Sequence, residues 1–202
     1  MSRRSRYDLR RMPCPYPVVT ADEAAAMISP GQTVGFGGFT VSGVPKAISI
    51  ALGERAARSD FRIKGFCVTS GPTVETALAG VLSFRCPYQA NARARAMINT
   101  GEVEFLDVHL SHLTQALRYG FLGPMHWAIV EAADITPDGG IVLTSGVGAA
   151  PTFCAVAERI LIELNRCQPA ALCGMHDIYS PADPPHRREI PIYRPSDRIG
   201  ET

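Results

Sequence analysis

Three glycine-bearing segments of this sequence each lie between a predicted strand and a predicted helix. They are residues 35–39, residues 69–71 and residues 145–148. Glycine lets a ligand approach the main chain closely, and the amides at the start of a helix favour negative charge. We therefore expect these segments to bind a carboxylate or to stabilise an oxyanion. The residues to which we assign this role are Gly37, Gly38, Phe39, Thr69, Ser70, Gly71, Ser145 and Gly146.

The same segments have a second interpretation that involves no ligand. A glycine-rich stretch also forms a tight turn, and a Thr-Ser-Gly sequence also caps a helix. Pro72 has no amide N–H, so a donor in the second segment must be Gly71, Thr73 or a neighbour. None of the segments matches a G-x-G-x-x-G or G-x-x-x-x-G-K-[ST] motif. Three such segments at equivalent strand ends nevertheless favour one shared crevice.

Charged residues near these segments offer a second kind of chemistry. Glu131 interrupts an apolar run, and a buried carboxylate must be paired or functional. Structural pairing is the favoured interpretation, with an active-site role as the alternative. Lys46 follows the first glycine segment and either meets an anionic ligand or is solvated. His176 and Asp177 have the residue types of an acid–base pair, although adjacent side chains rarely face each other.

Motifs for other chemistries are missing from the sequence or incomplete. His109 and His112 are three residues apart and are expected to share a helix face, but two histidines are too few for a zinc site. No G-x-S-x-G motif is present, which disfavours serine hydrolase chemistry. Glu54, Glu75 and Asp138 are predicted on helices or in a turn, where they are poor nucleophiles. We therefore expect no metal site within this chain.

Strands and helices alternate along the sequence. This order predicts an open α/β fold with a mostly parallel sheet and helices on both faces. The apolar runs 127–133 and 159–164 require cover on both faces of the sheet. A Thr20/Glu23 capping box predicts a helix start. The predicted strands are 33–36, 61–68, 102–106, 127–133, 141–144 and 159–164, and the predicted helices are 21–28, 44–58, 72–79, 91–98, 111–119 and 151–157.

Composition limits the class of protein. The 202 residues are 46% hydrophobic and 19% charged, which suits one medium α/β domain. A net charge of +1 argues against a dedicated nucleic-acid binder. No apolar run approaches the ~18 residues of a membrane span, and no secretory signal is evident. The six cysteines form no C-x-x-C pair, so we expect reduced, mostly buried thiols in a cytoplasmic protein.

Two segments differ in amino-acid composition from the rest of the chain. Residues 1–15 form a basic tail, and five prolines in residues 181–195 exclude a helix or central strand there. We expect a domain over residues 1–180 and a proline-rich arm over residues 181–202.

The ordered set of short motifs in this chain resembles the N-terminal half of the acetyl-CoA hydrolase/transferase family. No single motif is decisive, but their order and spacing over about residues 15–200 are specific. They are Gly35-Phe36-Gly37-Gly38-Phe39-Thr40, Gly43-Val44-Pro45-Lys46, Asn99-Thr100-Gly101-Glu102, Phe105-Leu106-Asp107, His109-Leu110, Val130-Glu131-Ala132, Ile135-Thr136-Pro137-Asp138-Gly139-Gly140-Ile141, Thr144-Ser145-Gly146-Val147-Gly148, Ile162-Glu163-Leu164-Asn165, Gly174-Met175-His176-Asp177-Ile178 and Asp197-Arg198-Ile199-Gly200.

The resemblance implies two similarly folded α/β domains with the active site between them. It implies that a glutamate attacks an acyl-CoA and becomes a glutamyl-CoA thioester, with coenzyme A as substrate and no separate cofactor. The acid partner is a small carboxylate such as acetate, succinate or propionate. The family's glutamate and most of its CoA-binding loops lie beyond Thr202, so the chain would need a complementary half.

Three interpretations follow from this resemblance. The chain is the N-terminal domain of a CoA-transferase or hydrolase, an inactive module that binds carboxylates or a partner, or an independent enzyme of the related sugar-isomerase fold. We expect the isolated chain to be inactive and to self-associate through an apolar surface that the absent half covers. We expect neither a nucleic-acid nor a membrane partner.

Overall fold

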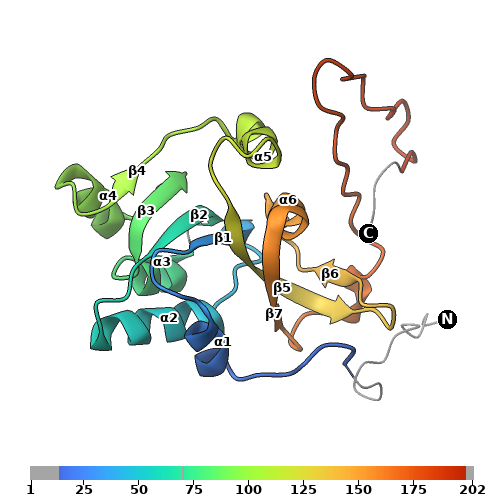
Figure 1. Ribbon diagram of the computed structural model, residues 1–202. Helices are drawn as coiled ribbons and strands as arrows, with labels where there is room; N and C mark the ends of the chain where they lie inside the picture. The colour runs from blue at the N-terminus through green and yellow to red at the C-terminus, as the bar shows by residue number, and fades with distance from the viewer. Residues whose placement is uncertain (1–13, 70, 199–202) are drawn as a thin grey trace.

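A computed structural model describes residues 14–69 and 71–198 of the chain (Figure 1). It contains a seven-stranded sheet in the order β4-β3-β2-β1-β5-β6, with β7 paired to β5. The strands are β1 Thr33–Thr40, β2 Ile63–Thr69, β3 Leu82–Pro87, β4 Glu104–Phe105, β5 Met125–Ile135, β6 Ile141–Leu143 and β7 Ala157–Leu164. The helices are α1 Ala21–Met27, α2 Ala47–Arg58, α3 Pro72–Leu78, α4 Ala92–Asn99, α5 Leu110–Arg118, α6 Ala150–Val156 and the 3-10 turn η1 Ala170–Leu172.

The long strand β5 organises the sheet. β7 pairs with it in parallel from Met125 to Ala132 along one edge. Along the other edge, β1 pairs with residues 127–129 in parallel, and β6 pairs with residues 132–135 in the antiparallel direction. Every other pairing in the sheet is parallel. The predicted open, mostly parallel α/β fold is therefore confirmed.

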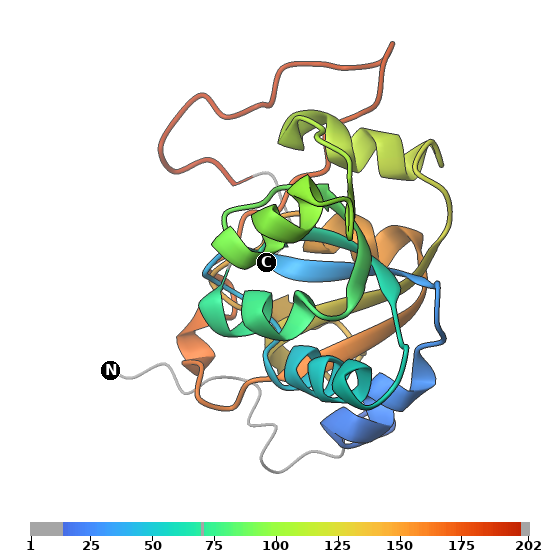
Figure 2. The same cartoon turned by 90° about the vertical axis from the view of Figure 1, so that its left-hand side faces the viewer.

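Helices cover both faces of the sheet (Figures 1 and 2). On one face, α1, α2 and α3 pack against Val34, Ile63 and Trp127, and on the other, α5 and α6 pack against Phe66 and Ala128. Because both faces are covered, the centre of β5 is buried from residue 127 to residue 132. This confirms the expectation that residues 127–133 form an inner strand.

Local sequence explains where several helices begin. At α1, the Thr20 side chain accepts the Glu23 amide N–H at 3.2 Å, and the Glu23 carboxylate accepts the Thr20 amide N–H at 2.7 Å. This is the predicted capping box. At α4, the Asn91 side chain accepts two amide N–H groups of the first turn. Among the described residues, no helix has the length and apolar character needed to cross a bilayer.

Three elements differ from the sequence-based expectation. No strand was predicted between residues 68 and 102, but β3 runs from Leu82 to Pro87. It was missed because Arg85, which is buried, makes the segment look polar. The first glycine segment was expected as a turn, yet β1 continues through it to Thr40. The expected cover on both faces of residues 159–164 is wrong, because Arg159 and Ile160 are exposed and only Leu161 of this segment is buried.

The buried ion pair between Arg85 and Glu75 ties β3 to α3. Two guanidinium nitrogens of Arg85 donate to the two Glu75 oxygens at 2.5 and 3.1 Å, and its Nε donates to the Tyr88 carbonyl at 2.7 Å. Both side chains are at most 2% exposed. Removing the charge of one partner leaves the other charge buried and uncompensated, which is strongly unfavourable.

We therefore expect Glu75→Gln to lower the free energy of unfolding by about 3–5 kcal/mol. The measurement is urea unfolding followed by the fluorescence of Trp127, the single tryptophan of the chain. The control is Glu54→Gln, which removes an exposed pair with Arg58 at 3.7 Å and should cost no more than about 0.5 kcal/mol. Equal losses in the two variants would contradict the role given to the buried pair.

Candidate functional site

The three glycine segments meet around residues 42–44. Gly38 forms a bridge with Gly148, and the hydroxyls of Ser42 and Ser145 lie 2.7 Å apart. A side chain at Gly71 would lie 3.7 Å from Val44. The structure thus brings together the three segments that the sequence predicted to share one rim.

The reason given for the third segment was wrong, however. We expected residues 145–148 at the rim because they follow a parallel strand. β6 instead runs antiparallel to β5, and it pairs with the last residues of that strand. A short antiparallel strand beside the end of β5 therefore delivers residues 145–148 to the carboxyl end of β1. Residues 145–148 therefore lie at the predicted rim, but the strand that leads to them runs antiparallel rather than parallel to its neighbour.

Several of these glycines serve contacts between the segments themselves. A Cβ atom at Gly38 would lie 2.5 Å from the Gly43 carbonyl oxygen, and φ there is +93°. A Cβ atom at Gly146 would lie 2.2 Å from the Ser42 carbonyl oxygen, and one at Gly148 would lie 2.3 Å from that of Gly38. Only glycine permits such close packing of backbone on backbone. These glycines are therefore required for the local structure, with or without a ligand.

Exposure divides the predicted site residues. Gly37, Gly38 and Gly71 are buried, whereas Phe39 is 44% exposed. Ser145 is exposed and Gly146 is half-buried. The predictions for Ser70 and for the side chain of Thr69 fall outside the described residues. The surface of the candidate site is therefore formed by Phe39, Ser145 and Gly146 rather than by the glycines of β1.

The residue after Phe39 has an unusual backbone. Thr40 has φ of +49°, the left-handed conformation that β-branched residues rarely adopt. It is the one non-glycine residue with positive φ among residues 14–69 and 71–198. Strain of this kind concentrates at functional sites, where surrounding structure maintains it. This strained residue lies at the end of β1, beside the exposed Phe39.

Both carboxylate oxygens of Glu131 accept hydrogen bonds from within the protein. Its side chain is 1% exposed. Lys46 Nζ and Asn165 Nδ2 each donate to Oε1 at 2.8 Å, and the Thr144 hydroxyl donates to Oε2 at 2.9 Å. Lys46 Nζ also donates to the Val44 carbonyl at 2.9 Å. These contacts favour the structural interpretation of Glu131, and they give Lys46 a partner within the chain.

Glu163 has a role that the sequence analysis missed. The amides of Lys46, Ala47 and Ile48 donate to its carboxylate at 2.7, 3.0 and 3.0 Å. The negative charge expected at the start of α2 is therefore supplied by β7 of the same chain. The available signal was an acidic residue inside an apolar strand, the same signal that singled out Glu131.

The histidines are held by contacts within the chain. His176 donates from Nε2 to the Thr144 carbonyl at 2.8 Å, because a carbonyl oxygen only accepts. His109 accepts the Ser111 amide at the start of α5, and its ring centroid lies 5.7 Å from that of His112. The two rings share a face as expected. Among the described residues, no group of three or more His, Cys, Asp or Glu side chains is arranged to hold a metal ion.

Three of the six cysteines are unreactive thiols. All six thiols are free, but only Cys67 and Cys86 are buried, so the expectation of mostly buried thiols is wrong. Burial raises the pKa of both thiols to about 12, and it raises the pKa of Cys154 to about 11. A thiol is nucleophilic as the thiolate. These three cysteines are therefore protonated and unreactive near neutral pH.

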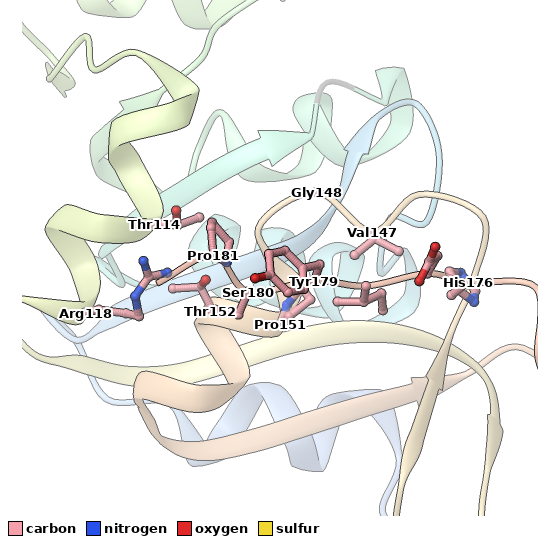
Figure 3. A pocket seen from close by; sticks show the side chains of 12 residues that line it. Thr114, Arg118, Val147, Gly148, Pro151, Thr152, His176, Tyr179, Ser180 and Pro181 are labelled. Atoms are coloured by element: carbon pink, nitrogen blue, oxygen red, sulfur yellow. The ribbon is translucent and has the colours of Figure 1, made fainter. Parts of the chain in front are cut away.

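A cavity of about 310 Å³ adjoins the third glycine segment (Figure 3). Its walls come from α5, from the turn before α6 and from the segment 176–181. Thr114 and Arg118 line it from α5, and Val147 and Thr152 line it from the turn and from α6 (Figure 3). Polar side chains such as Thr114, Arg118 and His176 line it together with apolar ones such as Val147 and Ile178.

The fold is that of coenzyme A transferases. The chain aligns with glutaconate coenzyme A-transferase from Acidaminococcus fermentans at a TM-score of 0.57 and 14% identity, covering 71% of this chain and 67% of that one. It aligns with RipA from Yersinia pestis at a TM-score of 0.60 and 21% identity, covering 75% and 37%. At such low identities, these likenesses describe the fold alone.

The sequence places the chain more narrowly. The model of the acetyl-CoA hydrolase/transferase N-terminal domain matches residues 1–194. The chain is 40% identical over 190 residues to succinyl-CoA:acetate CoA-transferase from Clostridium kluyveri, covering 92% of this chain and 35% of that protein. It is 38% identical to propanoyl-CoA:succinate CoA transferase from Escherichia coli, covering 90% and 39%. The chain therefore belongs to the acetyl-CoA hydrolase/transferase family, and it spans little more than a third of the length of these relatives.

The contacts between the glycine segments lead to a prediction about stability. We expect Gly146→Ala to lower the free energy of unfolding by about 2 kcal/mol or more, because the new methyl group meets backbone atoms that have little room to move. The control is Gly80→Ala, where a Cβ meets nothing within 4 Å. That control should be neutral or slightly stabilising. Thermal unfolding that ranks the two variants in the opposite order would exclude the proposed packing.

Proposed function

We propose that this chain is the N-terminal domain of an acyl-CoA hydrolase or CoA-transferase. It moves coenzyme A between an acyl-CoA and a small carboxylate such as acetate, succinate or propionate. The observation that carries the proposal is the 40% identity to a succinyl-CoA:acetate CoA-transferase over 92% of the chain. The convergence of the glycine segments at one rim agrees with it.

The nucleophile of this reaction is a glutamate in a C-terminal half that would follow the chain. Its carboxylate attacks the thioester carbonyl, which gives an acyl–glutamyl anhydride and releases the CoA thiolate. The thiolate then attacks the glutamyl carbonyl, which gives the glutamyl-CoA thioester and releases the first carboxylate. In a transferase, the acceptor carboxylate then attacks the glutamyl-CoA thioester, and the same two exchanges in the opposite direction give the new acyl-CoA and the free glutamate. In a hydrolase, water attacks instead and releases coenzyme A and the free acid. Each step exchanges one acyl bond for another.

Glu131 does not fit the role of nucleophile. Its two oxygens accept hydrogen bonds from Lys46, Thr144 and Asn165, and its side chain is 1% exposed. A nucleophilic carboxylate must reach a thioester carbon, which requires access and a free lone pair. Burial removes the access, and the three donors hold both of its oxygens in place. This agrees with our proposal that the catalytic carboxylate belongs to the C-terminal half.

The surface at the carboxyl end of the sheet supports the proposal of a second half. Phe39, Val41, Tyr88 and Phe105 lie at the ends of β1, β3 and β4, and each is at least 37% exposed. A row of exposed aromatic and aliphatic side chains on one rim is typical of an interface. The partner that we infer is the C-terminal half itself, whose loops would cover these side chains.

In the assembled site, we assign the exposed rim residues to the carboxylate and thioester pocket. Phe39 provides an apolar wall, and Ser145 and Gly146 provide a hydroxyl and an amide beside it. Thr69, Ser70 and Gly71 contribute donors from the neighbouring strand end, and Gly37 and Gly38 shape β1 beneath. Preorganised donors of this kind stabilise an oxyanion without reorganisation during the reaction. Coenzyme A enters as substrate rather than as a resident cofactor.

The test is a comparison of two proteins in an exchange assay with succinyl-CoA and acetate. The 202-residue chain alone should show no acetyl-CoA formation above background. A chimera in which this chain replaces the matching region of the Clostridium kluyveri relative should show exchange. Gly38→Val in the chimera should abolish that exchange, because the new side chain would strike the Gly43 carbonyl.

The outcomes distinguish the alternatives. Turnover by the chain alone would favour an independent enzyme. A folded chimera without turnover that still binds labelled succinate would favour a carboxylate-binding module. Gly80→Ala in the chimera is the matched control, and it should keep full activity.

A further inference from the structure

The segment 176–187, here called the strap, lies against the domain although it contains no helix or strand. It follows η1 and passes beside α6 and α5 (Figure 1). At its start, His176 donates to the Thr144 carbonyl at 2.8 Å. Its residues 176–181 form one wall of the 310 Å³ cavity, opposite Thr114 and Arg118 of α5 (Figure 3).

The strongest contact of the strap is a two-point ion pair. Arg118 of α5 donates from Nη2 to Asp183 Oδ1 at 2.5 Å and from Nε to Oδ2 at 3.3 Å. The two side chains are only 21% and 29% exposed. Each partner favours the charged form of the other, so the pKa of Asp183 is lowered and that of Arg118 is raised. Two-point pairing of a guanidinium with a carboxylate fixes orientation as well as distance.

Two further bonds flank this pair on α5 and at its end. The Tyr119 hydroxyl donates to the Pro184 carbonyl at 3.3 Å. Arg187 donates from Nη2 to Gln115 Oε1 at 2.7 Å. The strap therefore has contacts with one turn of α5 and the residue that follows it, at three successive points. Because these contacts act together, they hold the strap better than one isolated surface pair would.

Beyond Arg187 the character of the chain changes. In residues 188–198, the hydrogen bonds are local, such as those from the Tyr193 and Arg194 amides to Asp197. Ile190, Ile192 and Tyr193 are 48%, 50% and 74% exposed. The side-chain contacts with α5 thus end at Arg187, and residues 188–196 are exposed. Arg187 is therefore the boundary between the strap and the exposed residues that follow it.

We propose that Arg118 is a positioning residue that latches the strap through Asp183. The latch closes one side of the cavity and fixes the point and direction at which the chain leaves the domain. This role lies within the described chain and does not depend on the reaction proposed above. It makes the first part of the proline-rich arm a fixed part of the domain rather than a free linker.

Limited proteolysis with chymotrypsin tests the latch on the 202-residue chain. The bond after Tyr179 lies within the strap, and the bond after Tyr193 lies beyond it, so each sample carries its own reference site. Cleavage after Tyr193 should be rapid in every variant. Asp183→Asn and Arg118→Met should each raise the rate of cleavage after Tyr179 about tenfold, because cleavage follows the population of the open form.

Two variants make the result specific. The charge-reversed pair, Arg118→Asp with Asp183→Arg, should return cleavage after Tyr179 toward the wild-type rate. Arg58→Met removes an exposed helical pair with Glu54 and should change neither site. The melting temperature of each single variant should stay within about 2 °C of wild type, because the strap lies outside the core.

The proposal is overturned if cleavage after Tyr179 is as fast in the wild type as in Asp183→Asn. It is also overturned if the charge-reversed chain melts normally but its strap stays open. Global unfolding of Arg118→Met would be recognised by loss of its melting transition. In that case the rate of cleavage after Tyr179 in Asp183→Asn, which leaves α5 unchanged, tests the proposal.

Discussion

The burial of the Glu131 carboxylate is the constraint on which the rest of this structure depends. A charge in the middle of a sheet is tolerated only when it is paired and hydrogen-bonded. Its three partners are Lys46 before α2, Thr144 after β6 and Asn165 after β7. The requirement of one carboxylate therefore positions the segments that follow three different strands. The glycine contacts between residues 38–43 and 146–148 complete the same arrangement.

A second carboxylate, directly opposite Glu131 on the neighbouring strand, follows the same rule. Glu163 on β7 accepts the first amides of α2, so the start of that helix is satisfied from within the chain. Together, Glu131 and Glu163 leave no acidic side chain of this cluster free to react. The rim above them exposes apolar residues such as Phe39 and Val41 instead. Among the described residues, this rim exposes apolar side chains while the two carboxylates beneath it are already hydrogen-bonded, which agrees with the proposed two-part site.

Features determined by neighbouring residues could be predicted, and features determined by distant ones could not. The capping box at Thr20 and the apolar run of β5 act locally, so both were identified from the sequence. β3 was missed because buried Arg85 takes its partner Glu75 from another element. The role of Glu163 and the reversed direction of β6 also depend on residues far away in the chain. The assignment of ligand contacts to the glycine segments stays a prediction.

The most direct test of the account is to locate the covalent intermediate. The chimera described above would be incubated with succinyl-CoA, reduced with borohydride and digested, and the modified glutamate identified by mass spectrometry. We predict that the modified residue lies in the C-terminal part that the Clostridium kluyveri relative supplies and that the peptide containing Glu131 is unmodified. A reduced adduct on Glu131, or on any other acid of this chain, would contradict the account.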